Sequence, residues 1–474
     1  MTSDIGIARG TALYIGALLG PGLLLLPGLA ASQAGPASVV AWAALLGASA
    51  LFAVVFAALG VRHPSAGGVW GYATAGLGHR AGRVVAWCFL AGVIGGAPIV
   101  SVVGGNYVAE LTGGGVRVAA TTAAVLLVGS LAVTARGVRT SATVQFGLVA
   151  LLLVIVVGAV AGAAPASRAA NWTPFAPHGW VALGPTAATL MLAFVGWEAI
   201  APLTTRFARP RRQLPVVIAI AFAATAVVYL ALGFVTVGAL GEQAGTEVPL
   251  AALLRIGLGD IGTAVAAIGA VVLTTGAMLA YLAGAASLAR ALRPNTEERH
   301  LRARQPGPDL ARISARAESA GGERWRPVPA RDEEASRPPA AAEHGGGDEL
   351  RPRPARASVP GAGLPWWLGG GVLVSGLVLI LPLATGRIEL ATLVNVPTTF
   401  FLVVYLGCTA AGWRLLRGAP RICAGIACVM VAVVLTFCGS ALIPAAVVTT
   451  AAAIGRRRAP RVAGRPLEAA PDPG

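Results

Sequence analysis

The sequence predicts an all-α integral membrane protein with about twelve transmembrane helices. Of its 474 residues, 56% are hydrophobic and only 12% are charged, a composition typical of a polytopic membrane protein. Outside one segment near the middle of the chain, the charges fall between apolar runs, and each run is long enough for a span of roughly 20 residues. Glycine and proline interrupt two of these runs, about five spans apart.

The apolar runs place the expected spans in chain order. We expect them at about 11–33, 37–60, 82–108, 117–135, 142–164, 182–205, 214–238, 261–289, 363–385, 389–412, 419–437 and 439–455. Arginines concentrate in every second joint, for example Arg206, Arg209, Arg211 and Arg212 after the sixth run. By the positive-inside rule, this alternation places both termini in the cytoplasm. Arginine with abundant alanine, glycine and valine is typical of a high-GC bacterium, so we expect a multi-pass protein of a bacterial cytoplasmic membrane.

The segment between the eighth and ninth spans differs in composition from the rest. Residues 294–361 are rich in proline, arginine, glutamate, alanine and glycine and lack apolar periodicity. Such a composition buries too little apolar surface to fold, so we expect a disordered cytoplasmic loop. The predicted organisation is therefore spans 1–8 in 1–293, this loop, spans 9–12 in 362–455, and a cytoplasmic tail in 456–474.

Several classes of function fit the sequence poorly. The net charge of +16 comes from arginines at span ends, not from one basic surface with interleaved aromatics, which argues against nucleic acid binding. The five cysteines are scattered through apolar spans and the five histidines fall in loops, so no metal site or disulfide is indicated. No nucleotide-binding motif or catalytic cluster is present either. We therefore expect neither an enzyme nor a cofactor.

The first span carries an unusual break at Gly20-Pro21-Gly22. Unpaired backbone groups are costly at membrane depth and are tolerated only where protein or a water-filled cavity covers them. There they become ligands, although a plain kink is the simpler alternative because glycine and proline are common in transmembrane helices. The second break, from Ala193 to Pro202, falls in the sixth span. Two broken spans in corresponding halves indicate an inverted-repeat transporter with a site near the bilayer midplane.

The second break also carries Glu198, which alone among the nine acids outside residues 294–361 lies well inside a span. An intramembrane carboxylate is a functional-site candidate by default. It would bind a proton for coupling or gating; alternatively, it would accept backbone N–H bonds and have a structural role only.

Three motifs resemble the amino acid–polyamine–organocation (APC) superfamily of permeases. The first-span Gly-Pro-Gly-Leu-Leu-Leu-Leu-Pro resembles that family's glycine-rich break, and Phe194-Val-Gly-Trp-Glu198 resembles its Phe-x-Gly-x-Glu element. The sequence from Ala208 to Pro215 resembles its basic cytoplasmic joint before the seventh span. Overall, the chain is most similar to bacterial exporters of methionine and branched-chain amino acids. The resemblance implies two inverted five-helix repeats plus two peripheral helices, with an amino acid bound between broken helices 1 and 6.

The resemblance also implies roles for individual residues. Main-chain N–H groups at the first break would bind the substrate carboxylate, with Gly22 and Leu23 as donors because Pro21 has none. Carbonyls of Leu18, Leu192 and Val195 would accept from its ammonium group, and the Leu192 side chain would suit apolar substrates. The full set of expected substrate-binding residues is Leu18, Gly20, Pro21, Gly22, Leu23, Leu192, Phe194, Val195, Gly196 and Trp197, with Ser101, Asn106 and Tyr281 as further cavity candidates.

The sequence allows more than one coupling ion and more than one class of substrate. Thr274 and Thr275 suggest a sodium site, but threonine often bonds its own helix, so protons or exchange are preferred. No other acid lies at membrane depth to pair with a cationic side chain, which favours neutral amino acids over cationic ones. The resemblance to exporters of methionine and branched-chain amino acids implies hydrophobic substrates and efflux. The alternatives are an importer or exchanger of cationic amino acids or amines, and a non-transporting scaffold that uses the cytoplasmic loop. The partners expected are an amino acid, protons and the lipid bilayer.

Overall fold

The computed structural model describes residues 6–65, 67–137, 142–201, 204, 207–292, 364–385 and 390–454. Every helix named here belongs to one compact unit, Met1–Ala291 with Gly363–Gly474. The predicted cytoplasmic loop at 294–361 and the tail at 456–474 lie outside the described residues.

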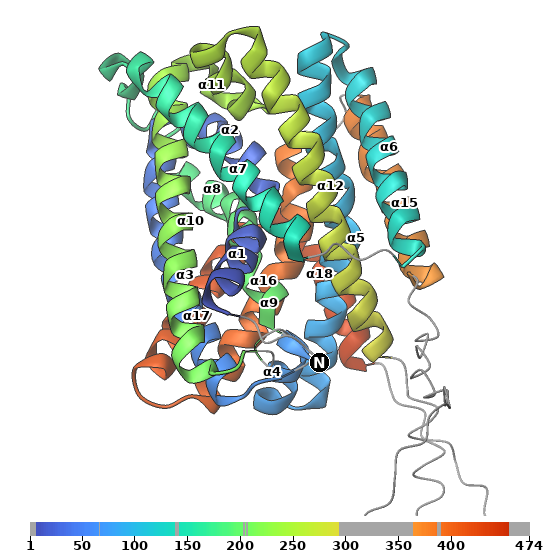
Figure 1. The fold of residues 1–474 in the computed structure, drawn as a ribbon. Helices are drawn as coiled ribbons and strands as arrows, with labels where there is room; N and C mark the ends of the chain where they lie inside the picture. Colours follow the sequence, from blue (N-terminus) through green and yellow to red (C-terminus); the bar gives the residue numbers. More distant parts are fainter. Residues whose placement is uncertain are drawn as a thin grey trace, which may run out of the picture. The chain divides into compact units, whose positions relative to one another are not determined.

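All elements assigned in these ranges are helices (Figure 1). The first half contains α1 (Ile7–Leu18), α2 (Gly22–Ala34), α3 (Ser38–Arg62), α4 (Gly68–Leu77), α5 (His79–Thr112), α6 (Gly115–Ala135), α7 (Ala142–Ala163), α8 (Leu183–Leu190) and α9 (Trp197–Ile200). The second contains α10 (Pro210–Leu240), α11 (Pro249–Leu258), α12 (Asp260–Ala291), α15 (Trp366–Ala384), α16 (Leu390–Leu415), α17 (Ala419–Thr436) and α18 (Leu442–Ile454). Short 3-10 turns are η1 (Gly35–Ala37), η2 (Ala164–Ala166), η3 (Ala169–Trp172), η4 (Trp180–Ala182), η5 (Met191–Phe194), η7 (Gly241–Gly245) and η8 (Gly439–Ala441).

The long helices confirm a multi-span membrane fold. Nine stretches of the described chain are long and apolar enough to cross a membrane; they are Gly22–Arg62, which joins α2 to α3, and stretches in α5, α6, α7, α10, α12, α15, α16 and α17. Three shorter apolar segments, α1 leading to α2, α8 leading to α9, and α18, correspond to the first, sixth and twelfth predicted spans. Two helices, α4 and α11, fall in joints where we predicted no element.

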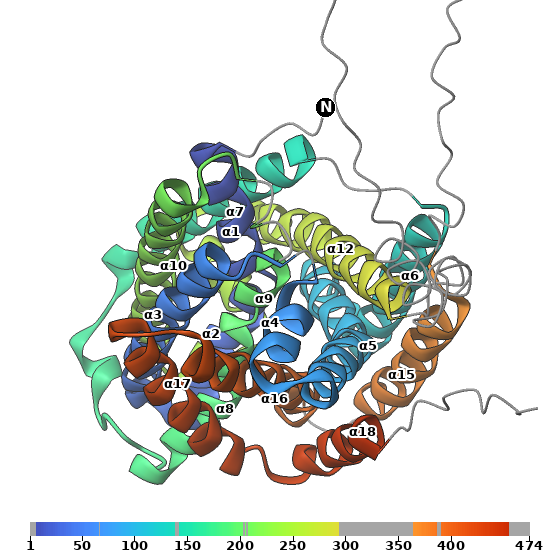
Figure 2. The ribbon, with the colours of Figure 1, turned by 90° about the horizontal axis from the view of Figure 1, so that it is seen from below.

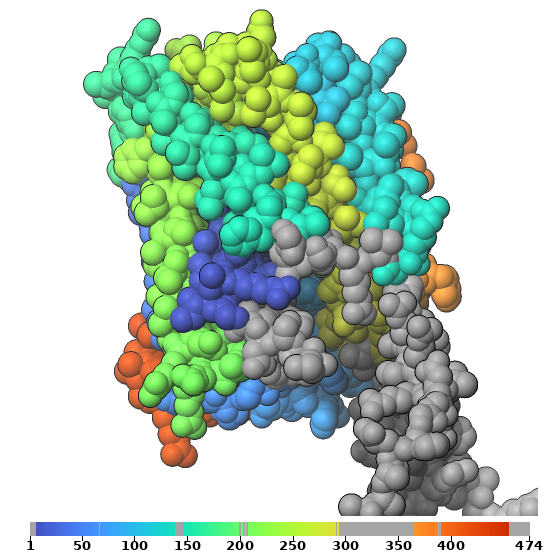
Figure 3. Space-filling model, in the orientation of Figure 1, coloured from blue at the N-terminus to red at the C-terminus, as the bar shows by residue number. Residues whose placement is uncertain are grey.

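The interrupted helices lie inside the bundle. In the view along the helices in Figure 2, α2 and α9 lie between α3 and α10 on one side and α5 and α16 on the other. The helix α1 reaches the surface between α7 and the beginning of α10, as the space-filling view in Figure 3 shows. Packing therefore covers the breaks themselves, as backbone groups in an apolar environment require.

Candidate functional site

The first break separates α1 from α2 at the predicted position. The α1 ladder ends at Leu18, and the N–H of Leu19 still donates to Ile15 O at 2.8 Å. Pro21 has no N–H and precedes the first residue of α2, Gly22. The N–H of Leu23 donates to Gly20 O at 3.1 Å, whereas Gly22, at the first position of α2, has no intrahelical acceptor. Of the two predicted donors, Gly22 is therefore the better placed to bind a ligand.

The second break is a longer change of backbone direction. The helix α8 tightens into η5, after which Val195 is extended, with φ −67° and ψ 117°. Gly196 then takes φ +156° and ψ −30°, which favours glycine, and α9 begins at Trp197. The fold thus confirms that the predicted first and sixth spans are both interrupted.

The two breaks touch through their main chains. A Cβ built on Gly196 would lie 2.6 Å from Ala17 O and 2.8 Å from Ala17 C, closer than real Cβ contacts. A Cβ built on Gly22 would lie 3.7 Å from Ala193 Cα. Only glycine at position 196 lets the end of α1 lie against the start of α9.

Tyrosine hydroxyls on two other helices bind the freed carbonyls. The Tyr229 hydroxyl on α10 lies 3.0 Å from Leu18 O and 3.2 Å from Ala193 O, so its single proton is shared between carbonyls of the two breaks. Tyr281 on α12 donates to Val195 O at 3.3 Å. Because a carbonyl oxygen has two lone pairs, Leu18 and Val195 can each still accept a second hydrogen bond from a substrate ammonium group. Leu192 O already accepts from Val195 N at 3.3 Å.

Glu198 is buried at the second break, with 1% of its surface exposed. Its Oε2 accepts from Gly196 N at 2.9 Å and lies 2.7 Å from the hydroxyl of Tyr405 on α16, which in turn lies 2.6 Å from Phe194 O. Tyrosine has a single hydroxyl proton. Both contacts of Tyr405 are satisfied at once only if Tyr405 donates to Phe194 and a protonated Glu198 donates to Tyr405.

The second carboxyl oxygen of Glu198 supports the same protonation state. Its Oε1 is buried and has no hydrogen-bond partner among the described residues. A buried, ionised oxygen without a partner is costly, whereas a neutral carboxyl avoids most of that cost. The surroundings of Glu198 therefore accommodate a proton better than a charge.

A cavity lies where the two breaks meet. It is lined by Ala17, Leu18, Gly20, Pro21, Gly22, Gly92, Val93, Gly96, Ala97, Ile99, Val100, Leu192, Val195, Tyr229, Met278, Tyr281, Pro397 and Phe401. Its empty space, open mouth included, is about 650 Å³. Its only side-chain hydroxyls are those of Tyr229 and Tyr281, and the described lining carries no charged side chain.

Part of the cavity wall comes from α5, where a proline interrupts the helix ladder. Pro98 cannot donate to Ile94 O, and the hydroxyl of Ser375 on α15 donates to that carbonyl at 2.6 Å instead. Ser101 donates to Pro98 O at 2.6 Å. These bonds stabilise α5 where Gly92 and Gly96 face the cavity.

The structure brings together only part of the predicted site. Leu18, Gly20, Pro21, Gly22, Leu192, Val195 and Tyr281 line the cavity, whereas Leu23, Ser101, Asn106, Phe194, Gly196 and Trp197 are absent from its described lining. Phe194 packs against both Trp42 and Tyr229, whose rings stack on each other. The indole N–H of Trp197 donates to Ser49 Oγ at 3.1 Å. These two aromatic side chains hold the second break against α3 and α10. The hydroxyl of Thr274, a candidate sodium ligand in the sequence, donates to Ala270 O of its own helix.

Sequence reasoning missed several residues of α5, α10, α12 and α16 at the site. Gly92, Gly96, Met278 and Phe401 resemble ordinary residues of apolar spans, so no local signal distinguishes them. Tyr229 and Tyr405 did carry a signal, because each places a polar hydroxyl in the middle of an apolar run.

The end of the bundle that carries α11 is closed by polar contacts. The hydroxyl of Tyr107 on α5 donates to Leu24 O at 2.7 Å and accepts from Leu250 N at 3.2 Å. A Cβ on Gly28 would collide with Thr246 O, so the chain before α11 lies directly on α2. These contacts cover α2 from the α11 end.

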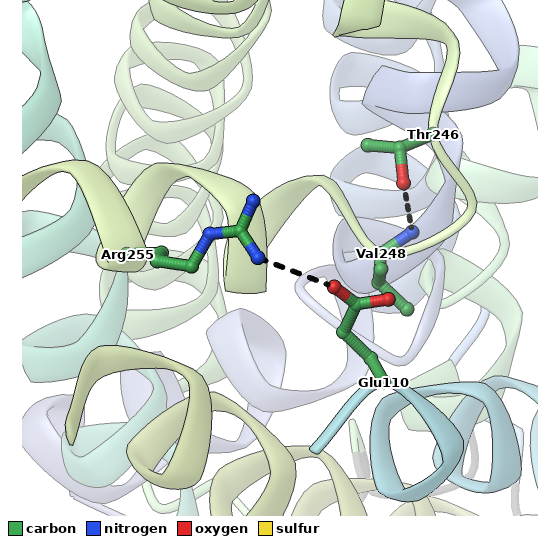
Figure 4. Close-up of polar contacts among 4 residues, drawn as sticks. All are labelled: Glu110, Thr246, Val248 and Arg255. Atoms are coloured by element: carbon green, nitrogen blue, oxygen red, sulfur yellow. Dashed lines mark hydrogen bonds and ion pairs between the residues drawn. The ribbon is translucent and has the colours of Figure 1, made fainter. Parts of the chain in front are cut away.

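Charged residues border this closed end. Arg255 on α11 lies 3.8 Å from Glu110 on α5, and Val248 N donates to Thr246 Oγ1 at the start of α11 (Figure 4). Asn106, a predicted cavity residue, instead donates to Glu247 Oε2 at 2.6 Å. Burial raises the pKa of the Glu247 carboxyl, and the hydrogen bond from Asn106 opposes that shift.

Removing the Tyr229 hydroxyl is expected to slow transport without unfolding the protein. In Tyr229→Phe, the carbonyls of Leu18 and Ala193 lose the one donor that they share, at a cost of about 1–3 kcal/mol. Since about 1.4 kcal/mol corresponds to a factor of ten, we expect roughly tenfold lower flux in proteoliposomes. Thr409→Val is the control, because that hydroxyl bonds only its own helix, to Tyr405 O and Leu406 O. Equal flux in the two variants would contradict a role for Tyr229 in joining the breaks.

Comparison with known proteins places this geometry in a family. Residues 5–293, more than half of the chain, match the family model described as "Amino acid permease". The uncharacterized amino acid permease YecA of Bacillus subtilis is 33% identical over 60% of this chain and 67% of its own length. The L-methionine/branched-chain amino acid exporter YjeH of Escherichia coli is 30% identical over 55% of this chain and 63% of its own. The branched-chain amino acid permease BcaP of B. subtilis is 26% identical over 59% and 65%. The chain thus spans about two thirds of the length of these relatives.

Proposed function

Because the chain belongs to the amino acid permease family of the APC superfamily, we propose that it is a secondary transporter of neutral, hydrophobic amino acids. It works by alternating access in a bacterial cytoplasmic membrane, with both termini in the cytoplasm, and couples efflux to protons. The observation that carries this proposal is the cavity itself, where freed main-chain groups meet apolar side chains.

The lining of the cavity suits both the main-chain groups and the side chain of a neutral amino acid. At the breaks, Gly22 N–H and the positive end of α2 attract the carboxylate, and the carbonyls of Leu18 and Val195 attract the ammonium group. These groups recognise any amino acid, whatever its side chain. Elsewhere in the lining, Val93, Met278 and Phe401 offer an apolar surface. A cationic side chain would lose its hydration there without gaining a partner.

Glu198 is the residue we propose for proton coupling. Its neutral form satisfies the contacts with Tyr405 and Phe194, and it accepts the N–H of Gly196 at the point where the second break turns. Loss of the proton would place a buried negative charge beside that turn. We infer that the charge shifts the balance between conformations of α9. Proton release would thereby be linked to the side of the membrane to which the cavity opens.

Two relatives support the substrate class. YjeH is named for the export of methionine and branched-chain amino acids and BcaP for branched-chain amino acids. The direction implied by the first name agrees with efflux. Import or exchange of the same substrates is the alternative, and the experiment must distinguish it from efflux.

The proposal is tested by flux measurements on purified protein in liposomes. Labelled leucine and methionine are supplied outside, with the lumen either more acidic or more alkaline than the outside. Proton antiport predicts faster uptake with the acidic lumen, and unlabelled neutral amino acids should compete while arginine should not. Uptake that is faster with the alkaline lumen would mean symport, and uptake that needs a luminal amino acid at any pH would mean exchange. Absence of leucine and methionine flux under every condition would contradict the substrate class.

A further inference from the structure

Tyr72 on α4 carries a buried hydroxyl that the proposed function does not use. The residue is 1% exposed, and its hydroxyl makes no well-aligned hydrogen bond to any described residue. Thr204 lies close to it, but the Thr204 hydroxyl donates its own proton to Ala201 O at 2.8 Å. Because buried hydroxyls without a partner are rare in native proteins, this one calls for a physical explanation.

The packing of α4 places Tyr72 on the same side of α16 as Glu198. The helix α4 lies next to α9 and α16, at the end of the bundle opposite α11, which we call the α4 end (Figure 1). A Cβ on Gly76 would lie 2.7 Å from Ala411 Cα, so the backbones of α4 and α16 touch there. About one turn earlier on the two helices lie Tyr72 and Cys408. Cys408 is within electrostatic range of both Tyr72 and Glu198.

Aromatic rings fill the space between the two groups. The ring of Phe56 on α3 lies 6.5 Å from the ring of Tyr72 and 5.8 Å from the ring of Tyr405, the hydroxyl partner of Glu198. The other carboxyl oxygen of Glu198, Oε1, is buried without a described partner, as the Tyr72 hydroxyl is. None of these four residues belongs to the described lining of the cavity. Two unpartnered oxygens are therefore present beside the second break and outside the substrate site.

A second hydroxyl near Glu198 leads toward the cavity instead. Tyr281 is within electrostatic range of Glu198 and lines the cavity, but its hydroxyl proton is bound to Val195 O at 3.3 Å. A proton relay through Tyr281 would have to break that bond at the second break. Tyr72 has no such bond to break, which favours the route on the side of α4.

We propose that Tyr72 relays the proton of Glu198 to the α4 end of the bundle, along a route separate from the substrate cavity. This inference rests on the proposed function, since it assumes that Glu198 exchanges a proton during transport. Buried waters bind polar groups that lack other partners, and Glu198 Oε1 and the Tyr72 hydroxyl are two such groups. Water bound to these groups carries the proton past the ring of Phe56.

The proton transfer changes the charge of Glu198 alone. On release, the carboxyl O–H bond breaks and its proton passes to water, while Tyr405 turns its single proton from Phe194 O to the carboxylate. Tyr72 takes up the proton on its oxygen as it gives its own hydroxyl proton to water at the α4 end. Tyr72 is therefore neutral before and after the step, and Glu198 is left as a carboxylate.

Tyr72→Phe is the test, because it removes the relay hydroxyl without breaking a well-aligned hydrogen bond among the described residues. Thr236→Val is the control, since it removes a buried hydroxyl on α10 that also lacks a described partner. Leucine uptake driven by a pH gradient is compared with exchange of leucine for leucine at equal pH, both in proteoliposomes.

We expect Tyr72→Phe to slow gradient-driven uptake about tenfold. This is less than the roughly 10²–10⁴-fold effect of a group that transfers a proton directly, because helix movements also limit the rate. Exchange of leucine for leucine should stay at the wild-type rate, and Thr236→Val should match the wild type in both assays. Equal slowing of both processes in Tyr72→Phe would mean a structural role and overturn the relay.

A measurement on the wild type keeps the inference testable if Tyr72→Phe does not fold. Infrared spectroscopy in heavy water follows deuteration of the neutral Glu198 carboxyl, whose band is identified by its loss in Glu198→Gln. Saturating leucine should leave this deuteration rate unchanged, because the proton does not pass through the cavity. Slower deuteration with leucine, or unchanged gradient-driven uptake in folded Tyr72→Phe, would overturn the relay alone. If the wild type shows no gradient-driven uptake, the proposed coupling fails and the inference fails with it.

Discussion

Gly196→Ala is expected to lower transport at least tenfold while most of the helix bundle stays folded. The added methyl group would lie 2.6 Å from Ala17 O, and no flexible side chain is present there to move aside. Overpacking and an unfavourable φ each cost about 1–3 kcal/mol, so the two breaks should separate instead of remaining in contact. With a factor of ten per about 1.4 kcal/mol, we expect flux to fall at least tenfold.

The measurement compares leucine flux in proteoliposomes with the elution profile and thermal stability of the purified variants. Gly47→Ala is the control, since a Cβ at that position of α3 meets nothing within 4 Å. Gly22→Ala is a graded companion, because its Cβ would press only on the end of the Leu26 side chain, at 3.0 Å. It should fold normally and raise the KM. Normal flux in Gly196→Ala would show that contact between the breaks is not needed for transport.

Glu198→Gln is expected to remove the response to a pH gradient while leaving a folded protein that still binds substrate. Glutamine fills the same volume and can still accept from Gly196 N, but it cannot release a proton. The component of leucine flux driven by the gradient should vanish, and the dependence of flux on pH should flatten. Exchange of leucine for leucine, which needs no net proton movement, should persist.

Tyr405→Phe tests the hydroxyl partner of Glu198 separately from the carboxyl group itself. It removes the hydroxyl between Phe194 O and Glu198 Oε2 but keeps the carboxyl group. We expect this variant to remain sensitive to pH, with its response displaced because Glu198 has lost a partner. If Glu198→Gln instead retained wild-type flux and an unchanged pH profile, Glu198 would be a structural acceptor for the Gly196 N–H and the coupling proton would bind elsewhere.

The features that could be predicted from sequence are those with a local physical cause. Long apolar runs and arginine-rich joints indicated the spans, because the cost of burying charge in lipid acts on each segment separately. The breaks were predictable for a similar reason, since Pro21 removes an N–H and Gly196 allows a backbone conformation that other residues avoid. Glu198 was recognisable because a single carboxyl inside an apolar run is costly wherever the run is packed.

Only the tertiary structure decided what surrounds the breaks. Phe194 and Trp197 are next to the second break in sequence, yet they pack toward α3 and α10, while the cavity is lined by Gly96, Met278 and Phe401 from distant helices. An apolar helix of uniform composition does not reveal which of its faces meets lipid, a neighbouring helix or a cavity. That choice depends on how α5, α10, α12 and α16 pack together, through contacts between residues far apart in the chain. The sequence by itself therefore determined the membrane fold and the positions of its two breaks, and the packing of separate helices determined the shape of the cavity and the partners of Glu198.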